Sequence, residues 1–317
     1  MKVAVLKGGR SLERQVSLRS GARVEDALGR LGHEVVPIDV GADFIRRLRE
    51  VRPEVAFIAL HGPDGEDGTV QELLEVLDIA YTGPGVAACV RCMDKVVAKH
   101  RMRESGIPTP DWVAFNQTAF RDLGAGDALA EIEDRLGFPL VIKPVGQGSA
   151  LGVRFAAAGE QVPEALVAAF SYDDRVLLER HVDGRELAVS LIDGEPLPVV
   201  EAIPQEEDAY DYEARYEIGR TEFACPAPLS EAEAGAVERA ARKTWEALGL
   251  SAFARVDLML GEDGPQVLEV NAIPGLTDTS LLPMAAEAAG LSFEALVERI
   301  LELALVSRPA AAPQPSG

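Results

Sequence analysis

The first ninety residues alternate short apolar runs with longer segments that repeat apolar positions every three to four residues. The runs have the length of β-strands, and the repeating segments have the period of amphipathic helices. The predicted elements are strands at 2–6, 34–40 and 55–60 and helices at 16–31, 43–50 and 69–77. Because this strand-helix-strand order is typical of parallel sheets, we expect an open α/β domain over residues 1–92.

The rest of the chain has the pattern of two α+β units, 93–184 and 185–306, followed by a tail at 307–317. The tail is rich in Pro and Ala, a composition that predicts disorder. The predicted elements of the central unit are helices at 93–105, 125–136 and 163–169 and strands at 112–115, 139–143 and 175–180. Those of the C-terminal unit are a strand at 186–192, an irregular stretch at 204–222, helices at 230–248 and 292–305, and a hairpin between these helices.

Polar residues alternate with apolar ones in this hairpin, so that Arg255 shares a face with Asp257, and Glu269 with Asn271. A turn over 261–265 would place Asp257 opposite Glu269 and Arg255 opposite Asn271. Facing carboxylates repel unless a cation lies between them, and hard oxygen ligands favour Mg²⁺ over zinc. The pattern therefore predicts a metal site. The alternative is an acidic hairpin that faces solvent, with Arg255 as a local salt-bridge partner.

The net charge of −21 argues against nucleic acid or an anionic membrane as a partner, because both require a basic surface. A phosphate ligand would then need local cations, and Lys supplies only six of the 31 basic residues. No apolar run reaches the roughly 18 residues that span a bilayer. The three Cys residues, in a chain too large to need disulfides, are expected to be reduced. We therefore expect a cytoplasmic protein.

Two of the six Lys residues, Lys143 and Lys95, stand in places that are unusual for a surface residue, although a charged residue near a helix end, as Lys95 is, is common. Lys143 ends an apolar strand, and the glycine-rich stretch 146–152 follows it. Glycine permits the positive φ angles with which successive N–H groups point at one anion. Lys95 opens a helix directly after Asp94. The first strand-helix junction has neither a G-x-G-x-x-G nor a P-loop sequence. A simple hairpin turn with a surface Lys is the alternative for Lys143.

Carboxylates and a histidine stand at the ends of other predicted elements. Glu179 and Glu186 lie at the exit and entry of two strands joined by a short linker, where their oxygens suit a purine amine and ribose hydroxyls. His61 follows the strand at 55–60, at the end where open α/β sheets bind ligands. Glu13 follows soon after the first predicted strand. A capped turn for His61 and a helix-stabilising carboxylate for Glu13 are the alternative interpretations.

Taken together, these segments resemble the ATP-grasp superfamily and, within it, the D-alanine–D-alanine ligases of bacterial cell-wall synthesis. The resemblance covers residues 1 to about 306 and depends on the order and spacing of short motifs. The motifs are Gly8-Gly-Arg-Ser-Leu-Glu13-Arg-Gln-Val-Ser-Leu18, His61-Gly-Pro-Asp-Gly-Glu-Asp-Gly68, Met93-Asp-Lys95, Lys143-Pro144, Gly148-Ser149, Tyr210-Asp-Tyr-Glu-Ala-Arg-Tyr216, Arg255-Val-Asp257 and Glu269-Val-Asn-Ala-Ile-Pro-Gly275. The resemblance implies an N-terminal open parallel-sheet domain and a two-lobed ATP-grasp fold.

The resemblance also implies a nucleotide site with bound metal. The implied ATP contacts are Lys95, Lys143, Ser149 and Arg215 at the phosphates, Glu179, Arg180 and Val182 at the adenine, and Glu186 at the ribose. Asp257, Glu269 and Asn271 would bind two Mg²⁺ ions, for which Mn²⁺ can substitute. These ions would offset the charge that develops during phosphoryl transfer.

The implied reaction joins two D-alanine molecules for peptidoglycan synthesis. ATP phosphorylates the carboxylate of one D-alanine, and the amine of the second attacks this acyl phosphate through a tetrahedral adduct that expels phosphate. Arg255 and the N–H of Gly275 would stabilise the oxyanion of the adduct. The implied amino-acid contacts are Glu13 and His61 for the first D-alanine and Ser280 and Leu281 for the second.

In this family a hydrogen-bonded Glu, Ser and Tyr trio closes a mobile loop over the site, and Glu13, Ser149 and Tyr216 stand at those positions. Two residues depart from the family pattern: Arg215 replaces the usual Lys, and Gln15 replaces a common Glu. Arg still offers a cation to phosphate, in a planar geometry. Related ligases that make D-alanyl-D-lactate replace the tyrosine signature, so Tyr216 favours an amine acceptor.

Two other functions remain open. One is an ATP-grasp carboxylate-amine ligase that uses a different amino acid, which substrate profiling would separate; biotin-dependent carboxylases match the first domain less well. The other is a nucleotide-sensing regulatory protein that keeps the fold without the chemistry. The intact set of Glu13, Arg255, Asp257, Glu269 and Asn271 argues against that second alternative. The family further implies a homodimer.

Overall fold

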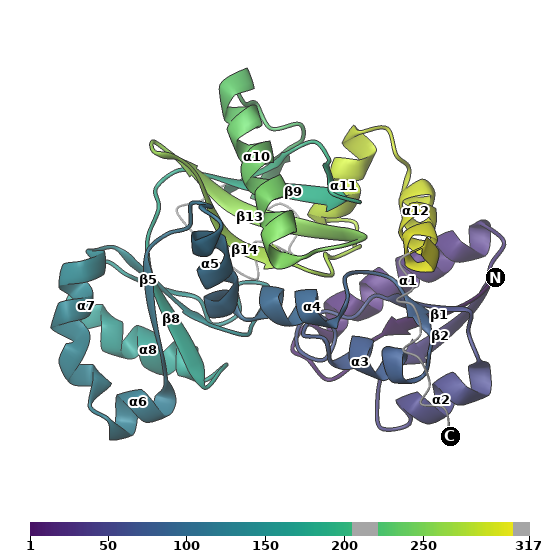
Figure 1. Cartoon of the computed structure of the whole chain (residues 1–317), viewed down its shortest axis with the longest axis horizontal. Helices are drawn as coiled ribbons and strands as arrows, with labels where there is room; N and C mark the ends of the chain where they lie inside the picture. Colours follow the sequence, from purple (N-terminus) through teal and green to yellow (C-terminus); the bar gives the residue numbers. More distant parts are fainter. Residues whose placement is uncertain (205–220, 307–317) are drawn as a thin grey trace.

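The computed structural model of the chain describes residues 1–204 and 221–306. Three sheets lie in a row along its long axis, with the N-terminal sheet at one end, the central sheet at the other, and the C-terminal sheet between them (Figure 1). The parallel N-terminal sheet and the two antiparallel sheets confirm the predicted mixture of α/β and α+β architecture. The division of the chain after 92 and after 184 stays a prediction.

The N-terminal sheet is parallel, in the order β2-β1-β3-β4. Its strands are β1 (Lys2–Lys7), β2 (Glu34–Asp39), β3 (Val55–Ile58) and the unpredicted β4 (Ala80–Tyr81), and its helices are α1 (Arg14–Arg30), α2 (Phe44–Val51) and α3 (Thr69–Val76). β3 is buried along its whole length, as expected for a central strand covered on both faces. Part of this cover is the C-terminal helix α12 (Phe293–Val306), whose Leu296 and Ile300 join one core with Val5 and Phe57.

The central sheet is antiparallel, in the order β5-β8-β6-β7. Its strands are β5 (Trp112–Asn116), β6 (Leu140–Pro144), β7 (Arg154–Ala156) and β8 (Arg175–Arg180), and its helices are α6 (Gln117–Asp122), α7 (Leu129–Leu136) and α8 (Val162–Phe170), with short 3-10 turns at Ala125–Ala128 and Gly159–Gln161. Leu166 of α8 packs with Ile142 and Leu178 of the sheet. β7 and α6 were not predicted, because elements this short do not show a period.

The C-terminal sheet runs in the order β12-β11-β9-β13-β14, with β10 added beside β9. Its strands are β9 (Arg185–Ile192), β10 (Glu195–Pro196), β11 (Val200–Pro204), β12 (Thr221–Ala224), β13 (Phe253–Gly261) and β14 (Gly264–Asn271), and its helices are α10 (Glu231–Leu248) and α11 (Leu281–Ala288). One face carries Leu187, Val189 and Val256, which share an apolar core with Val237 of α10. The polar residues of β13 alternate with this apolar set and therefore lie on the other face.

The polar residues of the β13–β14 hairpin pair as the alternation predicts. Asp257 lies opposite Glu269, and Arg255 lies opposite Asn271. Asp257 and Arg255 are only 4% and 9% exposed. Their burial contradicts the alternative of an acidic hairpin that faces solvent.

The turn of this hairpin is shorter than predicted. Gly261 pairs with Gly264, so the turn has two residues and the expected five-residue turn is wrong. Continued along the strands, that register would place Asp257 opposite Leu268. Instead the pairing shifts by one residue, with Leu268 as the extra residue of a β-bulge in β14. The bulge restores the pairing of Asp257 with Glu269.

The helix predicted at 93–105 is α5 (Lys95–Glu104), and a separate helix, α4 (Val86–Met93), directly before it was not predicted. Asp94 between them is extended, with φ −82° and ψ 98°, and its carboxylate accepts hydrogen bonds from the N–H groups of Val96 (3.0 Å) and Val97 (2.9 Å). This N-cap satisfies two backbone donors that a helix start leaves open. It also fixes Lys95 as the first residue of α5.

The strands that carry Glu179 and Glu186 are consecutive in sequence but belong to different sheets. β8 pairs with β5 and β6 in the central sheet, whereas β9 pairs with β11 and β13 in the C-terminal sheet. The linker 181–184 therefore crosses from one sheet to the other. Local periodicity reveals strands but carries no information about the sheet that each one joins.

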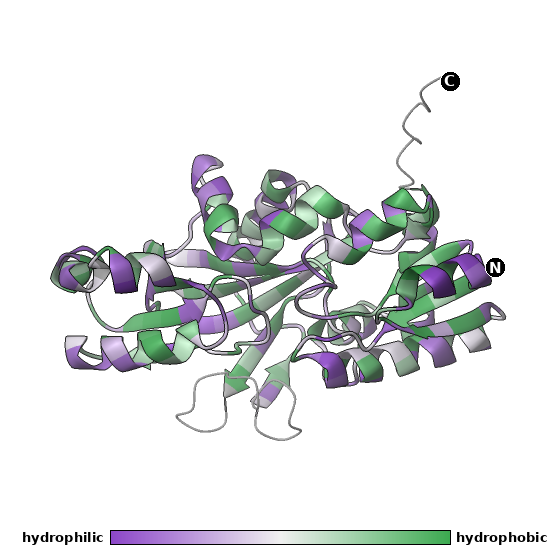
Figure 2. Ribbon diagram, turned by 90° about the horizontal axis from the view of Figure 1, so that it is seen from below, coloured by the Kyte–Doolittle hydropathy of each residue, from purple (hydrophilic) through white to green (hydrophobic). Residues whose placement is uncertain are grey.

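Hydropathy follows the layers of the fold. The strands are mostly apolar, whereas most helices have an apolar side toward a sheet and a polar side away from it (Figure 2). Within residues 1–204 and 221–306, no helix combines the length and the apolar character needed to cross a bilayer.

Candidate active site

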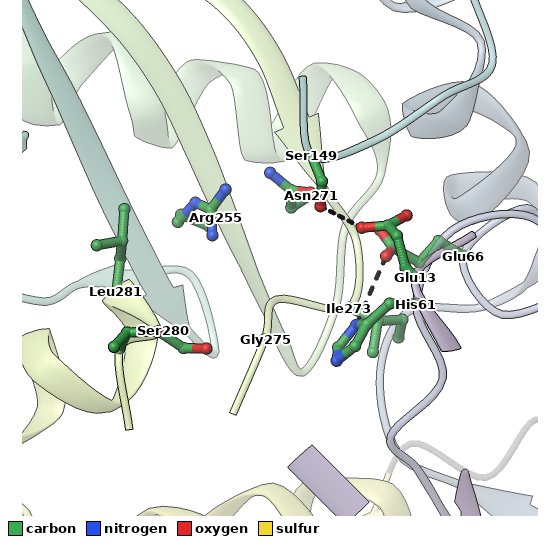
Figure 3. A pocket seen from close by; sticks show the side chains of 11 residues that line it. Glu13, His61, Glu66, Ser149, Arg255, Asn271, Ile273, Gly275, Ser280 and Leu281 are labelled. Atoms are coloured by element: carbon green, nitrogen blue, oxygen red, sulfur yellow. Dashed lines mark hydrogen bonds and ion pairs between the residues drawn. The ribbon is translucent and has the colours of Figure 1, made fainter. Parts of the chain in front are cut away.

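A pocket of about 470 Å³, counting the part open to solvent, lies between the N-terminal part and the C-terminal sheet (Figure 3). Its lining residues are Glu13, His61, Glu66, Ser149, Arg255, Asn271, Ile273, Gly275, Thr279, Ser280 and Leu281. Eight of these eleven residues were singled out from the sequence, and they come from segments far apart in the chain. The structure brings these eight together, while the role of each stays a prediction.

Glu13 is the buried acid of this pocket, at 3% exposure, and it immediately precedes α1. The hydroxyl of Ser149 donates a hydrogen bond to its Oε1. Its Oε2 is buried and has no hydrogen-bond partner within the described part of the chain. A Cβ atom at Gly62 would lie 2.5 Å from this Oε2, and one at Gly148 would lie 3.2 Å from it. The two glycines therefore leave space for a donor group, and the carboxylate suits an ammonium.

His61 and Glu66 lie beside Glu13 on the loop after β3. Nε2 of His61 is 2.9 Å from the hydroxyl of Ser20, and its Nδ1 is 3.7 Å from a carboxylate oxygen of Glu66. Burial raises the pKa of Glu13, and the negative charge of Glu66 raises it further, while the hydrogen bond from Ser149 opposes both. The carboxyl of Glu13 therefore takes up a proton at a higher pH than an ordinary Glu does.

Arg255 is fixed by a two-point ion pair with Asp257. Its Nε and Nη2 donate to the two carboxylate oxygens at 2.6 and 2.7 Å, and the side-chain amide of Asn271 donates to one of them at 3.0 Å. Two parallel hydrogen bonds define the plane of a guanidinium as well as its position. Arg255 thus presents an oriented cation at the middle of the pocket, between Glu13 on one side and Ser280 on the other (Figure 3).

A second pocket of about 320 Å³ adjoins the first, because Glu66 and Asn271 line both. Lys95 is its cation: Nζ lies 3.2 Å from Oε2 of Glu269 and donates to the carbonyl oxygen of Gln147 at 2.5 Å. The loop that bears this carbonyl is the glycine-rich stretch predicted to bind phosphate. The neighbouring pockets thus place a buried acid and a cation-lined cleft in one site.

Lys143 is not the surface Lys of the alternative interpretation. Its Nζ lies 2.8 Å from Oε1 of Glu179, and Lys99 forms an ion pair with the other oxygen of the same carboxylate. Burial alone would raise the pKa of Glu179, but the two ammonium groups hold it below its ordinary value. Burial lowers the pKa of Lys99 to about 8.

The loop between β14 and α11 forms the far wall of the first pocket. A Cβ atom at Gly275 would lie 2.7 Å from the hydroxyl oxygen of Ser280, so this close approach requires glycine. Ser20 of α1 holds the loop from the opposite side, because its hydroxyl accepts a hydrogen bond from the N–H of Leu276 at 3.2 Å. Helix α1 therefore contacts both sides of the pocket.

Comparison with known proteins identifies the family. Models of the D-ala D-ala ligase N-terminus and C-terminus match residues 45–84 and 102–302. The chain belongs to the D-alanine–D-alanine ligase family. A D-alanine–D-alanine ligase of Syntrophotalea carbinolica is 45% identical over 300 residues, which are 95% of each chain.

Solved structures of the Bacillus anthracis D-alanine–D-alanine ligase resemble this ligase along almost the whole chain. One has a TM-score of 0.85 and 36% identity, and another, in complex with ATP, has a TM-score of 0.83 and 34% identity. Each alignment covers 97% of this chain and 98% of the other. The resemblance inferred from the motifs, including the ATP-grasp fold, is thereby confirmed.

The ligase offers Mg²⁺ an oxygen set that suits a metal-nucleotide complex. Asp257 and Glu269 face each other across the hairpin, and Asn271 adds a side-chain amide. In the described ranges, no three His, Cys, Asp or Glu side chains gather into a group able to hold a metal ion. Mg²⁺ needs no such cage, since it usually keeps several waters and takes one or two carboxylates plus substrate phosphates. These residues therefore fit Mg²⁺ that arrives with ATP.

The residues predicted to contact the adenosine lie near the junction of the central and C-terminal sheets. The guanidinium of Arg180 donates to the carbonyl oxygen of Leu136 at 3.1 Å. Val182 lies in the linker between β8 and β9, and Glu186 pairs with Met259 of β13. Glu186 therefore shares the polar face of the sheet. The adenosine contacts of these residues stay a prediction.

Two predicted residues of the loop, Arg215 and Tyr216, lie outside the described residues. Gln15, the other departure from the family pattern, is an exposed residue of α1. An exposed side chain at this position contributes little to the buried environment of Glu13.

Sequence reasoning missed three buried polar residues of the ligase, Glu66, Lys99 and Ser20. Glu66 stands inside the glycine-rich motif that begins at His61, so the motif itself was the signal. Lys99 follows Lys95 by four residues, which places both on one helix face. Ser20 occupies a core-facing position of α1, where a hydroxyl needs a partner.

Removing the hydroxyl of Ser20 should impair catalysis without preventing folding. Ser20→Ala deletes two hydrogen bonds, one with His61 and one with the N–H of Leu276, and we expect kcat/KM for the amino acid to fall roughly 10-fold. Steady-state kinetics of ADP release would measure this. Ser105→Ala, at an exposed serine, is the matched control. An unchanged kcat/KM in Ser20→Ala would contradict the positioning role.

Proposed function

We propose that this ligase joins two D-alanine molecules, with ATP as the phosphoryl donor, and releases D-alanyl-D-alanine, ADP and phosphate for peptidoglycan synthesis. The observation that carries the proposal is the order of groups in the first pocket. Glu13 offers a carboxylate to an ammonium on one side, and Ser280 begins a helix on the other. Arg255 lies between them as an oriented cation, where an oxyanion would form between two amino acids.

In the first step, a carboxylate oxygen of one D-alanine attacks the γ-phosphorus of ATP, and the bond from that phosphorus to ADP breaks. Glu13 accepts the ammonium of this D-alanine, with His61 near its carboxylate. Lys95 and Lys143 bind phosphate oxygens beside the glycine-rich loop. Two Mg²⁺ ions, or Mn²⁺, would compensate the charge that develops during phosphoryl transfer. Asp257, Glu269 and Asn271 are the residues proposed to hold them.

In the second step, the amine nitrogen of the other D-alanine attacks the acyl carbon and loses a proton, and the bond from this carbon to the phosphate oxygen breaks. Arg255 and the N–H of Gly275 stabilise the negative oxygen of the intermediate adduct. Ser280 and the N–H of Leu281, at the start of α11, bind the carboxylate of the incoming D-alanine. A helix N-terminus favours such an anion.

The hydrogen bond from Ser149 to Glu13 supports a role in closing the site, because it joins the glycine-rich loop to the start of α1. Tyr216 is proposed to complete this trio and Arg215 to add a cation for phosphate. Closure would keep water from the acyl phosphate. Adenine is proposed to contact Glu179, Arg180 and Val182, and the ribose Glu186. A cytoplasmic location and a homodimeric state are also part of the proposal, carried over from the resemblance to the family.

The raised pKa of Glu13 predicts an acidic limit to activity. The ammonium of D-alanine requires the ionised carboxylate, so kcat/KM for D-alanine should fall as the pH drops through this raised pKa. Glu66→Gln removes the negative neighbour and lowers the pKa of Glu13, so the acidic limb should move to lower pH. Glu72→Gln, at an exposed carboxylate of α3, is the control. A limb that stays in place, or moves to higher pH, would count against Glu13 as the ammonium acceptor.

The proposed function is tested by ADP and phosphate release from Mg-ATP with D-alanine, L-alanine, D-serine and D-lactate, and by the mass of each product. Release that depends on D-alanine and yields the dipeptide supports the proposal. Release with another amino acid alone would point to a different carboxylate-amine ligase. Nucleotide binding without turnover on any acceptor would favour a nucleotide-sensing protein.

A further inference from the structure

Three buried charges form a cluster at the junction of α5, β6 and β8. Lys99, Glu179 and Lys143 are 0%, 2% and 6% exposed. Oε2 of Glu179 forms an ion pair with Lys99, and its Oε1 lies 2.8 Å from Nζ of Lys143. Each carboxylate oxygen therefore has its own ammonium, and the two contacts fix the plane of the carboxylate.

Lys99 is itself anchored by groups outside the two pockets, neither of which it lines. Its Nζ donates to the hydroxyl of Thr109 at 2.6 Å and to the carbonyl oxygen of Pro110 at 3.3 Å, and it lies 5.2 Å from the ring centroid of Trp112. Because Lys99 lines neither pocket, it can affect a bound ligand only through a neighbouring side chain. That side chain is Glu179, with which Lys99 forms an ion pair.

The surroundings of Glu179 favour its ionised form. Lys143 and Lys99 hold its pKa low against the effect of burial, and Arg103 is a further charged group near Lys99. An ionised carboxylate only accepts hydrogen bonds, whereas a protonated one can also donate. Two contacts with lysines leave acceptor capacity on the oxygens. Glu179 therefore has acceptors, and no donor, for a ligand group that would contact it.

We propose that Lys99 is a positioning residue for nucleotide selection, which keeps Glu179 ionised and oriented so that the site prefers a 6-amino purine to a 6-oxo purine. This inference rests on the proposed contact between adenine and Glu179. The amino group of adenine donates to an ionised carboxylate, whereas the oxo group of hypoxanthine is an acceptor and is repelled. Protonation of Glu179 would reverse this difference, because the acid could donate to the oxo group.

The test compares ATP with inosine triphosphate (ITP) in Lys99→Met, which removes the charge and keeps an unbranched side chain. The ratio of kcat/KM for ATP to that for ITP should fall roughly 10-fold, as expected for a lost hydrogen bond to a charged group. Most of the change should be in KM for ATP, with kcat and the KM for D-alanine within about threefold of native, because Lys99 lines neither pocket. Lys243→Met, at an exposed Lys of α10, is the control.

The pH profile separates this role from a structural one. In Lys99→Met the remaining ammonium of Lys143 opposes burial alone, so the pKa of Glu179 rises and the ATP preference should weaken as the pH is lowered from about 7 to about 5, a range below the pKa of the native Lys99. The native ratio should stay flat over the same range. A Lys99→Met protein whose ATP preference equals the native one at every pH would overturn the proposal.

Two further variants keep the proposal testable where Lys99→Met does not fold. Glu179→Gln alone should lose the preference for ATP, because its amide can donate to the oxo group. Lys99→Met combined with Glu179→Gln removes two of the three buried charges and should show the same ratio as Glu179→Gln. A Glu179→Gln protein that retains the native preference overturns the inference. By contrast, a native protein that makes no dipeptide from D-alanine and ATP would refute the proposed function itself.

Discussion

Asp257→Asn should lower the kcat of the ligase by roughly 1,000-fold or more, because several kcal/mol of transition-state stabilisation depend on the bound metal. Asparagine has nearly the volume of aspartate but lacks the charge that opposes Glu269 across the hairpin and pairs with Arg255. The loss should appear in ADP release at saturating Mg-ATP and D-alanine. Calorimetry with Mg-ATP should show weaker binding of the metal-nucleotide complex.

The control for this prediction lies in the same hairpin. Asp263→Asn changes an exposed carboxylate of the two-residue turn and should leave kcat and Tm at native values. Circular dichroism of Asp257→Asn should show an intact fold, because the pairing of β13 with β14 and β9 does not depend on this charge. Near-native turnover in Asp257→Asn would refute the assignment of Asp257 as a metal ligand.

Arg255→Met should reduce kcat by roughly 100- to 1,000-fold, the range measured when one donor to a reacting oxyanion is removed. KM for ATP should change little, because Arg255 lines the first pocket and not the one beside Lys95. The kcat loss should persist at saturating D-alanine, since the missing interaction forms only with the developing negative oxygen. Single-turnover kinetics would place the loss in formation of the dipeptide.

Arg255→Met also leaves Asp257 buried beside a single amide donor, so its Tm should fall. Arg255→Lys keeps a positive charge and separates the two effects. It should recover much of the lost Tm but little kcat, because Lys cannot form the two-point contact that orients the guanidinium. Arg242→Met, at an ion pair with Glu195 on the surface, is the control and should retain native kcat. A native kcat in Arg255→Met would exclude the oxyanion role.

The hairpin shows how far sequence alone leads. Alternation along β13 and β14 correctly predicted which polar residues face each other, because the side-chain period of a strand is local information. The route to that register was wrong, since a two-residue turn and a bulge at Leu268 give the same pairing as the predicted five-residue turn. Backbone irregularities that compensate for each other leave no trace in hydrophobic patterning.

The residues that orient the site could not be predicted from the sequence pattern, for a different reason. Lys99 and Ser20 lie in helices, and their partners Glu179 and Leu276 are distant in sequence. The burial of Lys99 and of Ser20 can be understood only from the tertiary contact that gives each polar group its partner. Short motifs located the residues expected to contact substrates, such as Arg255, because these residues stand close together in the sequence. The residues that orient them are scattered along the chain and belong to no motif.

The packing of α12 has a consequence for synthesis of the chain. The N-terminal sheet is complete once residue 81 has been made, yet Val5 and Phe57 share their core with Leu296 and Ile300, which are translated much later. Until α12 leaves the ribosome, this apolar surface of the sheet lacks its cover and is open to misassociation. Truncation before α12 should therefore lower the solubility of a protein that contains the N-terminal sheet.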